Sequence, residues 1–183
     1  MRKINRNNVI QMRVGEVREG LLDLCRFLQN NNVKIMAEIG VYAGASTEEF
    51  AKVVDKIYAI DPFEGGYDPR DKASLSNMEL VEKEFDEIVN KYKNITKIKK
   101  DSICASSFFK DKSLHFSYID GCHTEEATFK DIECFLPKIE DGFFIGGHDF
   151  TSRKHPGVRR AILSFFEEKD IIVFKDTSWI VRV

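Results

Sequence analysis

The chain has 183 residues, of which 43% are hydrophobic and 32% are charged. This length and balance fit one globular α/β domain, exclude a second full domain and argue against long disordered segments. The formal net charge of −2 excludes an overall field that would attract nucleic acid or an anionic membrane.

Near the start, apolar residues recur at helical spacing and predict an amphipathic helix over residues 14–29. These residues are Val14, Val17, Leu21, Cys25 and Leu28. We expect residues 1–34 to form a helical segment that packs on a core domain of residues 35–183. No apolar run follows the charged start, and no stretch approaches the roughly 20 apolar residues of a membrane span. We therefore expect a cytoplasmic protein with no signal peptide, no membrane contact and reduced cysteines.

Short apolar runs then alternate with amphipathic segments. The runs that read as buried strands are residues 35–40, 57–60, 95–98, 114–119 and 143–145. The segments that read as helices begin near residues 46, 78, 125 and 156. This alternation predicts a doubly wound, mostly parallel sheet, and residues 171–174 and 179–183 predict a C-terminal antiparallel hairpin.

Helix starts and loops follow from single residues. Ser46 and Glu49 have the spacing of a capping box, and Thr124 is a candidate N-cap. Residues 64–77 are rich in turn-forming types and predict a long loop, a candidate lid over a site.

The first apolar run leads into a glycine turn and a helix start. Glycine lets the backbone approach a ligand closely, and a helix N-terminus favours negative groups. The residues expected to contact a cofactor here are Glu38, Gly40, Tyr42, Gly44 and Ser46. The alternative is that the glycines serve only tight packing.

Two further features support a nucleotide-like cofactor. Asp61 ends the second strand, where an acid can accept hydrogen bonds from both ribose hydroxyls. Asp101 and Ser102 follow the third strand, where they are placed to meet an adenine edge. Asp61 alone could merely cap a turn before Pro62, but the three features together favour a cofactor site.

A nicotinamide-binding domain is the natural competitor, yet its GxGxxG fingerprint is absent because residue 42 is Tyr. The spacing is Gly-x-x-x-Gly preceded by an acid. This pattern resembles motif I of class I S-adenosylmethionine-dependent methyltransferases, and the terminal hairpin resembles their last two strands.

Motifs in the second half narrow the resemblance. They are Ile-Asp-Gly-Cys-His at 119–123, Gly-Gly-His-Asp-Phe at 146–150 and His-Pro-Gly-Val at 155–158. With the glycine turn, they are similar to the methyltransferase family that includes the macrolide sugar O-methyltransferases and is related to the catechol O-methyltransferases. The resemblance covers roughly residues 35–166.

The resemblance implies a Rossmann-like sheet of seven strands, S-adenosylmethionine as methyl donor, a small-molecule or sugar hydroxyl as acceptor and often Mg²⁺ or Mn²⁺. The positions that match the family's metal site are Asp120, His148 and Asp149. His123 matches the position of a base in related enzymes, and Asp120 and Asp149 are the acids beside it.

One departure from the family and several alternatives stay open. Catechol-type sites have Asn where this chain has His148-Asp149. Mg²⁺ prefers oxygen ligands, so His148 is a poor ligand for it. The site could therefore be metal-free or bind a borderline metal. Asp149 could instead cap a loop, and His123 could cap a helix. The basic run 153–154 with 159–160 could bind a phosphorylated or nucleic-acid acceptor, but reads first as a solvated face. A cofactor-binding module without turnover and a homo-oligomer are also open.

Overall fold

A computed structural model describes residues 9, 10, 12, 13, 15–69 and 71–183. The helices are α1 (Glu16–Asn30), α2 (Ala45–Ala51), α3 (Met78–Lys91), α4 (Ser102–Ser106), α5 (Glu125–Phe135) and α6 (Pro156–Leu163), with short 3₁₀ turns η1 (Leu136–Lys138) and η2 (Glu168–Asp170). The strands are β1 (Ile35–Ile39), β2 (Lys56–Ile60), β3 (Ile95–Ile98), β4 (Leu114–Ile119), β5 (Ile139–Gly147), β6 (Ile172–Val173) and β7 (Trp179–Arg182).

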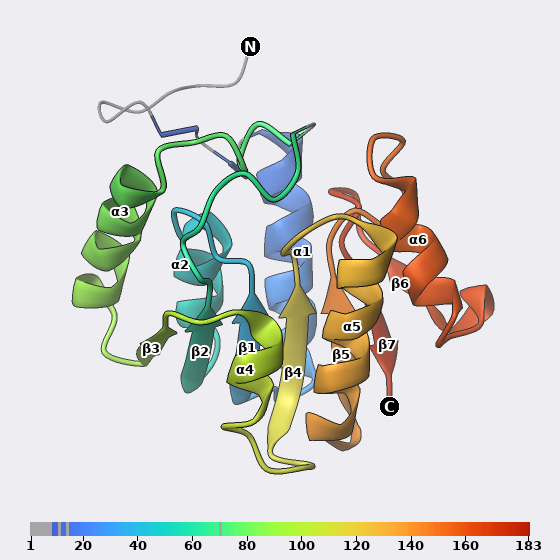
Figure 1. Cartoon of the computed structure of the whole chain (residues 1–183). Helices are drawn as coiled ribbons and strands as arrows, with labels where there is room; N and C mark the ends of the chain where they lie inside the picture. The colour runs from blue at the N-terminus through green and yellow to red at the C-terminus, as the bar shows by residue number, and fades with distance from the viewer. Residues whose placement is uncertain (1–8, 11, 14, 70) are drawn as a thin grey trace.

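The seven strands form one sheet in the order β3-β2-β1-β4-β5-β7-β6 (Figure 1). Strands β1 to β5 run parallel to one another, whereas β7 runs antiparallel to both β5 and β6. The predicted doubly wound sheet and C-terminal antiparallel hairpin are therefore confirmed. The strand order reverses between β1 and β4, which is where such sheets bind ligands.

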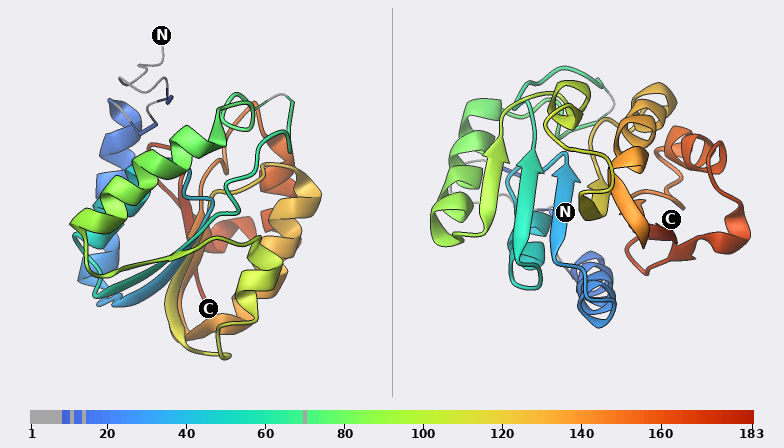
Figure 2. Two further views of the ribbon diagram at one scale, coloured as in Figure 1. Left: turned by 60° about the vertical axis from the view of Figure 1, so that its left-hand side comes forward. Right: turned by 90° about the horizontal axis from the view of Figure 1, so that it is seen from below.

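Three helices cover each face of the sheet (Figure 2). Helices α1, α2 and α3 pack on one face, and α4, α5 and α6 pack on the other. Because successive strand residues point to opposite faces, Met36 and Phe144 join the first core and Ala37 and Ile145 join the second. Both faces are buried, which explains the nearly continuous apolar runs in the strands.

The N-terminal helix differs in detail from its prediction. It begins at Glu16, Leu21 and Leu28 are buried as expected, and Val14 lies outside the described residues. Val17 is 38% exposed, because it lies at the edge of the cleft described below rather than on the core face.

The predicted capping box is wrong. Helix α2 has Gly44 as its N-cap, in the left-handed conformation, and Ser46 lies one residue inside the helix. The Ser46 hydroxyl donates to Glu38, while Glu49 pairs with Arg18 and Lys52. The spacing was right for a box, but both side chains have stronger partners elsewhere.

The remaining helices and strands either agree with the predictions or are longer or additional to them. Thr124 caps α5 by accepting from the Ala127 N–H at 3.2 Å. Strand β5 is longer than predicted because its first half, although polar, pairs with the chain end through the Gly142 N–H and Val183 carbonyl. Helix α4 was not predicted, since its five residues carry no helical periodicity. None of the described helices has the length and apolar character to cross a bilayer.

Candidate functional site

The site residues expected from the sequence gather at the carboxyl ends of the five parallel strands β1 to β5. All of them except Glu38 and Gly44 line a cleft of about 1350 Å³, which the loop between β2 and α3 and the described residues of the N-terminal segment also border. Backbone hydrogen bonds align the strand ends, since the Asp120 N–H donates to Ile39 and the His148 N–H donates to Ile119. Parallel pairing therefore brings together residues far apart in the sequence.

The glycine turn after β1 depends on the missing side chain of Gly40. Its φ is +83°, and a Cβ atom there would lie 2.3 Å from the Asp120 carbonyl oxygen. Any other residue would push β1 and β4 apart, so Gly40 keeps the two halves of the cleft in contact. Tyr42 connects the glycine turn to the loop before α3, because its hydroxyl lies 2.8 Å from the hydroxyl of Ser76.

Asp61 holds this turn in place. Its Oδ2 accepts from the Val41 and Tyr42 N–H groups at 3.1 and 3.0 Å, and its Oδ1 accepts from the Phe63 N–H at 2.7 Å. Burial raises the pKa of Asp61, and the three N–H donors oppose that rise. Asp61 thus lines the cleft and also ties the end of β2 to the glycine turn, a structural task that the sequence did not reveal.

Glu38 lies beneath the turn and is fully buried. One carboxyl oxygen accepts from Ser46, and the other has no hydrogen-bond partner within the described chain. Burial raises the pKa of Glu38 to about 7, against the opposing effect of Ser46. Glu38 does not line the cleft itself, whereas Gly40, Tyr42 and Ser46 do.

Glu38→Gln should reduce the loss of stability on going from pH 5 to pH 8. A carboxyl whose pKa rises from 4.5 in the unfolded chain to about 7 in the fold stabilises fully below pH 4.5, and loses that contribution as the pH rises through 7. The loss is about 2–3 kcal/mol at 1.36 kcal/mol per unit. Urea unfolding of both proteins at the two pH values measures it. The exposed Glu64→Gln is the control, and an equal pH dependence in wild type and Glu38→Gln would contradict the prediction.

The adenine side of the expected cofactor site is built around α4. Asp101 caps this helix by accepting from the Cys104 N–H at 2.8 Å, and Ser102 donates to Asp131. Asp131, from α5, is a buried acid on the cleft wall, and burial raises its pKa to about 6. Asp131 was not predicted as a site residue, because it lies within a helix and follows neither a strand nor a motif.

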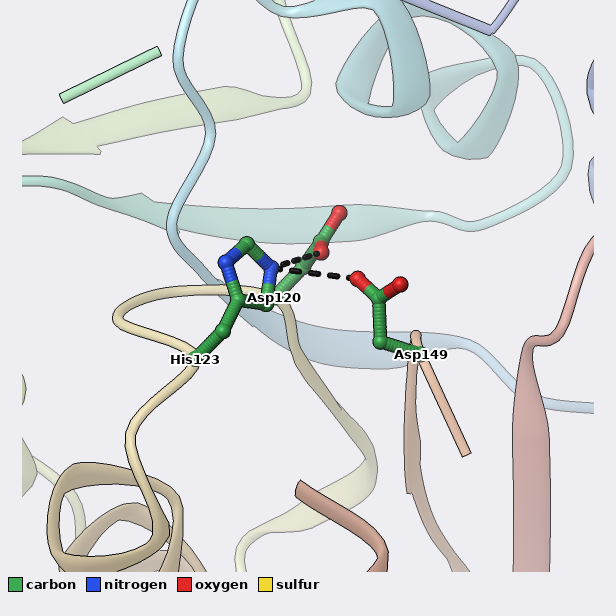
Figure 3. A group of neighbouring side chains, drawn as sticks. All are labelled: Asp120, His123 and Asp149. Atoms are coloured by element: carbon green, nitrogen blue, oxygen red, sulfur yellow. Dashed lines mark hydrogen bonds and ion pairs between the residues drawn. The ribbon is translucent and has the colours of Figure 1, made fainter. Parts of the chain in front are cut away.

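The second half of the cleft contains Asp120, His123 and Asp149. Figure 3 shows one ring nitrogen of His123 facing both carboxylates. This Nε2 lies 3.5 Å from Asp120 Oδ1 and 3.1 Å from Asp149 Oδ2. Asp149, the second residue after β5, has a left-handed backbone (φ 66°), a conformation that aspartate tolerates better than most residues.

Two other histidines border this group. The His148 Nδ1 lies 2.9 Å from Asp149 Oδ2 and 3.9 Å from Asp120 Oδ1, so His148 bonds to Asp149 more closely than it approaches Asp120. The His155 ring lies against the His123 ring, with centroids 4.3 Å apart.

Arg13 is a site residue that the sequence analysis missed. Its guanidinium forms an ion pair with Asp120 Oδ2 and donates to the Tyr118 hydroxyl at 3.3 Å, and its side chain is only 8% exposed. It therefore approaches the carboxylate oxygen opposite the one that faces His123. Arg13 belongs to a stretch without periodicity or motif, so no sequence signal pointed to it.

The buried charges shift one another's pKa values. Burial alone would lower the pKa of His123, but contacts with Asp120, Asp149 and Asp71 outweigh it and raise the pKa to about 12. Burial opposes ionisation of Asp120 and Asp149, yet their pKa values lie below the usual range, because Arg13 stabilises the first and His123 and His148 stabilise the second. The described site thus holds ionised carboxylates beside a protonated His123.

Comparison with known proteins identifies the family. A family model described as a methyltransferase domain matches residues 37–150. The chain belongs to this methyltransferase family. The match contains both the glycine turn and the His148-Asp149 pair, so the resemblance drawn from the motifs is confirmed. Comparison with curated proteins finds no match.

Solved O-methyltransferases share the fold at low identity. TomG of Streptomyces achromogenes, involved in tomaymycin synthesis and solved in complex with SAM, is 12% identical, with 91% of this chain and 80% of TomG covered and a TM-score of 0.63. NovP is 18% identical, with coverage of 93% and 81% and a TM-score of 0.64. An O-methyltransferase of Bacillus cereus, solved with SAH, is 18% identical, with coverage of 89% and 79% and a TM-score of 0.57.

The residues present fit a divalent cation. Asp120, His123 and Asp149 each offer a ligand atom, and these atoms lie within 4.8 Å of one another. With the imidazole as a third ligand the set suits Mn²⁺ or a later transition metal better than Mg²⁺, whereas the two carboxylates alone suit either Mg²⁺ or Mn²⁺. In this grouping the histidine beside the two acids is His123, whereas the family positions had suggested His148.

Proposed function

We propose that this methyltransferase transfers the methyl group of S-adenosylmethionine to a hydroxyl of a small molecule or sugar, with a divalent cation, Mg²⁺ or Mn²⁺, at Asp120 and Asp149. The observation that carries the proposal is one continuous cleft. It joins the glycine turn and Asp61 to the pair of acids beside His123. A cofactor on the first half and an acceptor on the second would therefore meet within a single cavity.

The cofactor half is proposed to act by binding and orientation. When bound, S-adenosylmethionine supplies a sulfonium methyl group that an oxygen nucleophile displaces in line. Asp61 accepts hydrogen bonds from the ribose, the turn from Gly40 to Gly44 leaves room for close backbone contact, and Asp101 and Ser102 border the adenine. Holding donor and acceptor together removes the cost of a bimolecular encounter.

The acceptor half is proposed to handle the hydroxyl proton. A divalent cation, when bound, would lower the pKa of the acceptor hydroxyl and orient it. Asp120 and Asp149 would hold this cation by their carboxylate oxygens, and His123, which is then not a ligand, takes the proton at Nε2 as general base. Described residues of the loop 64–77 border the cleft, and in this proposal the loop acts as a lid that limits the access of water.

Asp61→Ala should weaken binding of S-adenosylmethionine by about 1.5–3 kcal/mol, roughly 10- to 150-fold in Kd, the scale of hydrogen bonds to a charged group. Titration calorimetry measures the affinity, and circular dichroism checks that the variant still folds although Asp61 no longer bonds to the glycine turn. Glu79→Ala, at an exposed position outside the cleft lining, is the control. Unchanged affinity in Asp61→Ala would remove this residue from the cofactor site.

Removing metal should abolish methyl transfer, and Mn²⁺ should restore it. The assay screens hydroxylated small molecules and sugars with labelled S-adenosylmethionine, before and after chelation with metal content measured. Full transfer by verified metal-free protein would contradict the cation. Cofactor binding without any transfer would instead favour a non-catalytic binding module.

A further inference from the structure

The ring of His123 has a second polar atom, Nδ1, which points away from Asp120 and Asp149. This atom is buried, and it has no aligned hydrogen-bond acceptor within the described residues. The carboxylate at ion-pair distance from it is that of Asp71, with Oδ2 3.4 Å away. A buried ring nitrogen needs such a partner, because an unpaired polar group is costly in a water-poor site.

Asp71 belongs to the loop between β2 and α3, and this loop holds it firmly. Its Oδ1 accepts from the Ala73 N–H at 3.0 Å, its N–H donates to the Asp68 carbonyl at 3.1 Å, and its side chain is 10% exposed. One carboxylate oxygen is therefore used inside the loop, and the other faces His123. Because one Asp71 oxygen is bonded within the loop, the position of the loop determines where the other oxygen lies relative to His123.

We propose that Asp71 is a positioning residue, which holds His123 by Nδ1 so that Nε2 faces Asp120 and Asp149, and which thereby couples the loop over residues 61–77 to the alignment of the acceptor site. This inference rests on the proposed role of His123. The geometry is that of a carboxylate–histidine pair, in which the bond at one ring nitrogen fixes the orientation of the other. His155 restrains the ring plane from the side but offers no such directional bond.

The test uses Asp71→Asn in the full chain labelled with ¹⁵N-histidine. Asparagine keeps an oxygen for the Ala73 N–H but loses the second carboxylate oxygen. In wild type, the His123 Nδ1–H should give a downfield, slowly exchanging signal in a ¹H–¹⁵N correlation spectrum, assigned by its loss in His123→Asn. In Asp71→Asn this signal should move upfield or exchange away, while Glu64→Gln, which removes one charge from the same loop, should keep it. An unchanged His123 signal in Asp71→Asn would overturn the proposal.

A double-mutant cycle supplies an independent measurement. If the two side chains act as a pair, Asp71→Asn combined with His123→Asn should unfold at no lower temperature than the less stable single variant. Additive decreases in Tm would overturn the pairing. Neither measurement needs cofactor, metal or acceptor. A failure of methyl transfer would therefore count against the proposed function. An unchanged His123 signal in Asp71→Asn, or additive decreases in Tm, would count against the role of Asp71.

Discussion

Arg13→Met should destabilise the protein by about 3–5 kcal/mol, the cost of breaking a buried ion pair by removing one partner. The guanidinium forms an ion pair with Asp120 Oδ2, and both side chains are largely buried. Methionine has a similar length but no charge, so Asp120 would remain ionised beside Asp149 without this partner. Urea unfolding at pH 7 measures the change.

The pH dependence and two further variants make the test sharper. Arg13 helps to hold the pKa of Asp120 below its usual range, so the stabilisation is present above the usual aspartate pKa and is lost as the pH falls. Adding Asp120→Asn to Arg13→Met should recover part of the stability. Arg18→Met, which removes the solvent-exposed partner of the Glu49 ion pair, should cost much less, because water screens the Arg18 guanidinium. Equal losses in Arg13→Met and Arg18→Met would contradict the prediction.

The strands were predictable because their apolar runs are short, continuous and bounded by turn residues. Strands β3 and β4 have the bounds expected, although β4 is buried along most of its length and β3, at the edge of the sheet, is mostly half-buried. Strand β5 was predicted too short, because Glu140, Asp141 and Gly142 look like a turn when the pairing with the chain end is unknown. Local pattern shows burial, but it does not show which polar segments find a neighbouring strand.

The site was predictable to the extent that it lies on strand ends. Parallel strands bring their carboxyl ends to one edge, so acids that follow β2, β4 and β5 had to share a cleft. Arg13 and Asp71 could not be inferred, because they come from segments without periodicity and reach the site only through the tertiary fold. Arg13 lies 107 residues from Asp120 in the sequence. Arg13 balances the charge of Asp120 and Asp71 orients His123, and neither role can be recognised from the pattern of apolar residues in the strands.

His123→Ala should lower kcat for methyl transfer by about 10²- to 10⁴-fold, the usual contribution of a positioned base, while the affinity for S-adenosylmethionine stays near that of wild type. The affinity should persist because Asp61 and the glycine turn lie on the other half of the cleft. Calorimetry with the cofactor, and initial rates across pH on the acceptor found by screening, measure the two effects separately.

The charge state of His123 decides how it can act. With its Nε2 between two carboxylates and its pKa raised to about 12, the imidazole carries a proton through the neutral range and cannot accept another. Asp120 and Asp149 keep that proton on the ring, and they are also the proposed ligands of the cation. A cation held by Asp120 and Asp149 would offset the negative charge that keeps the proton on the ring, which would allow His123 to act as a base. Two results are therefore expected together in His123→Ala: the lower kcat, and the loss of the low-pH limb of the rate profile seen with metal present. A variant that keeps both the wild-type kcat and that limb would return His123 to a structural role and leave Asp149 or water as the proton acceptor.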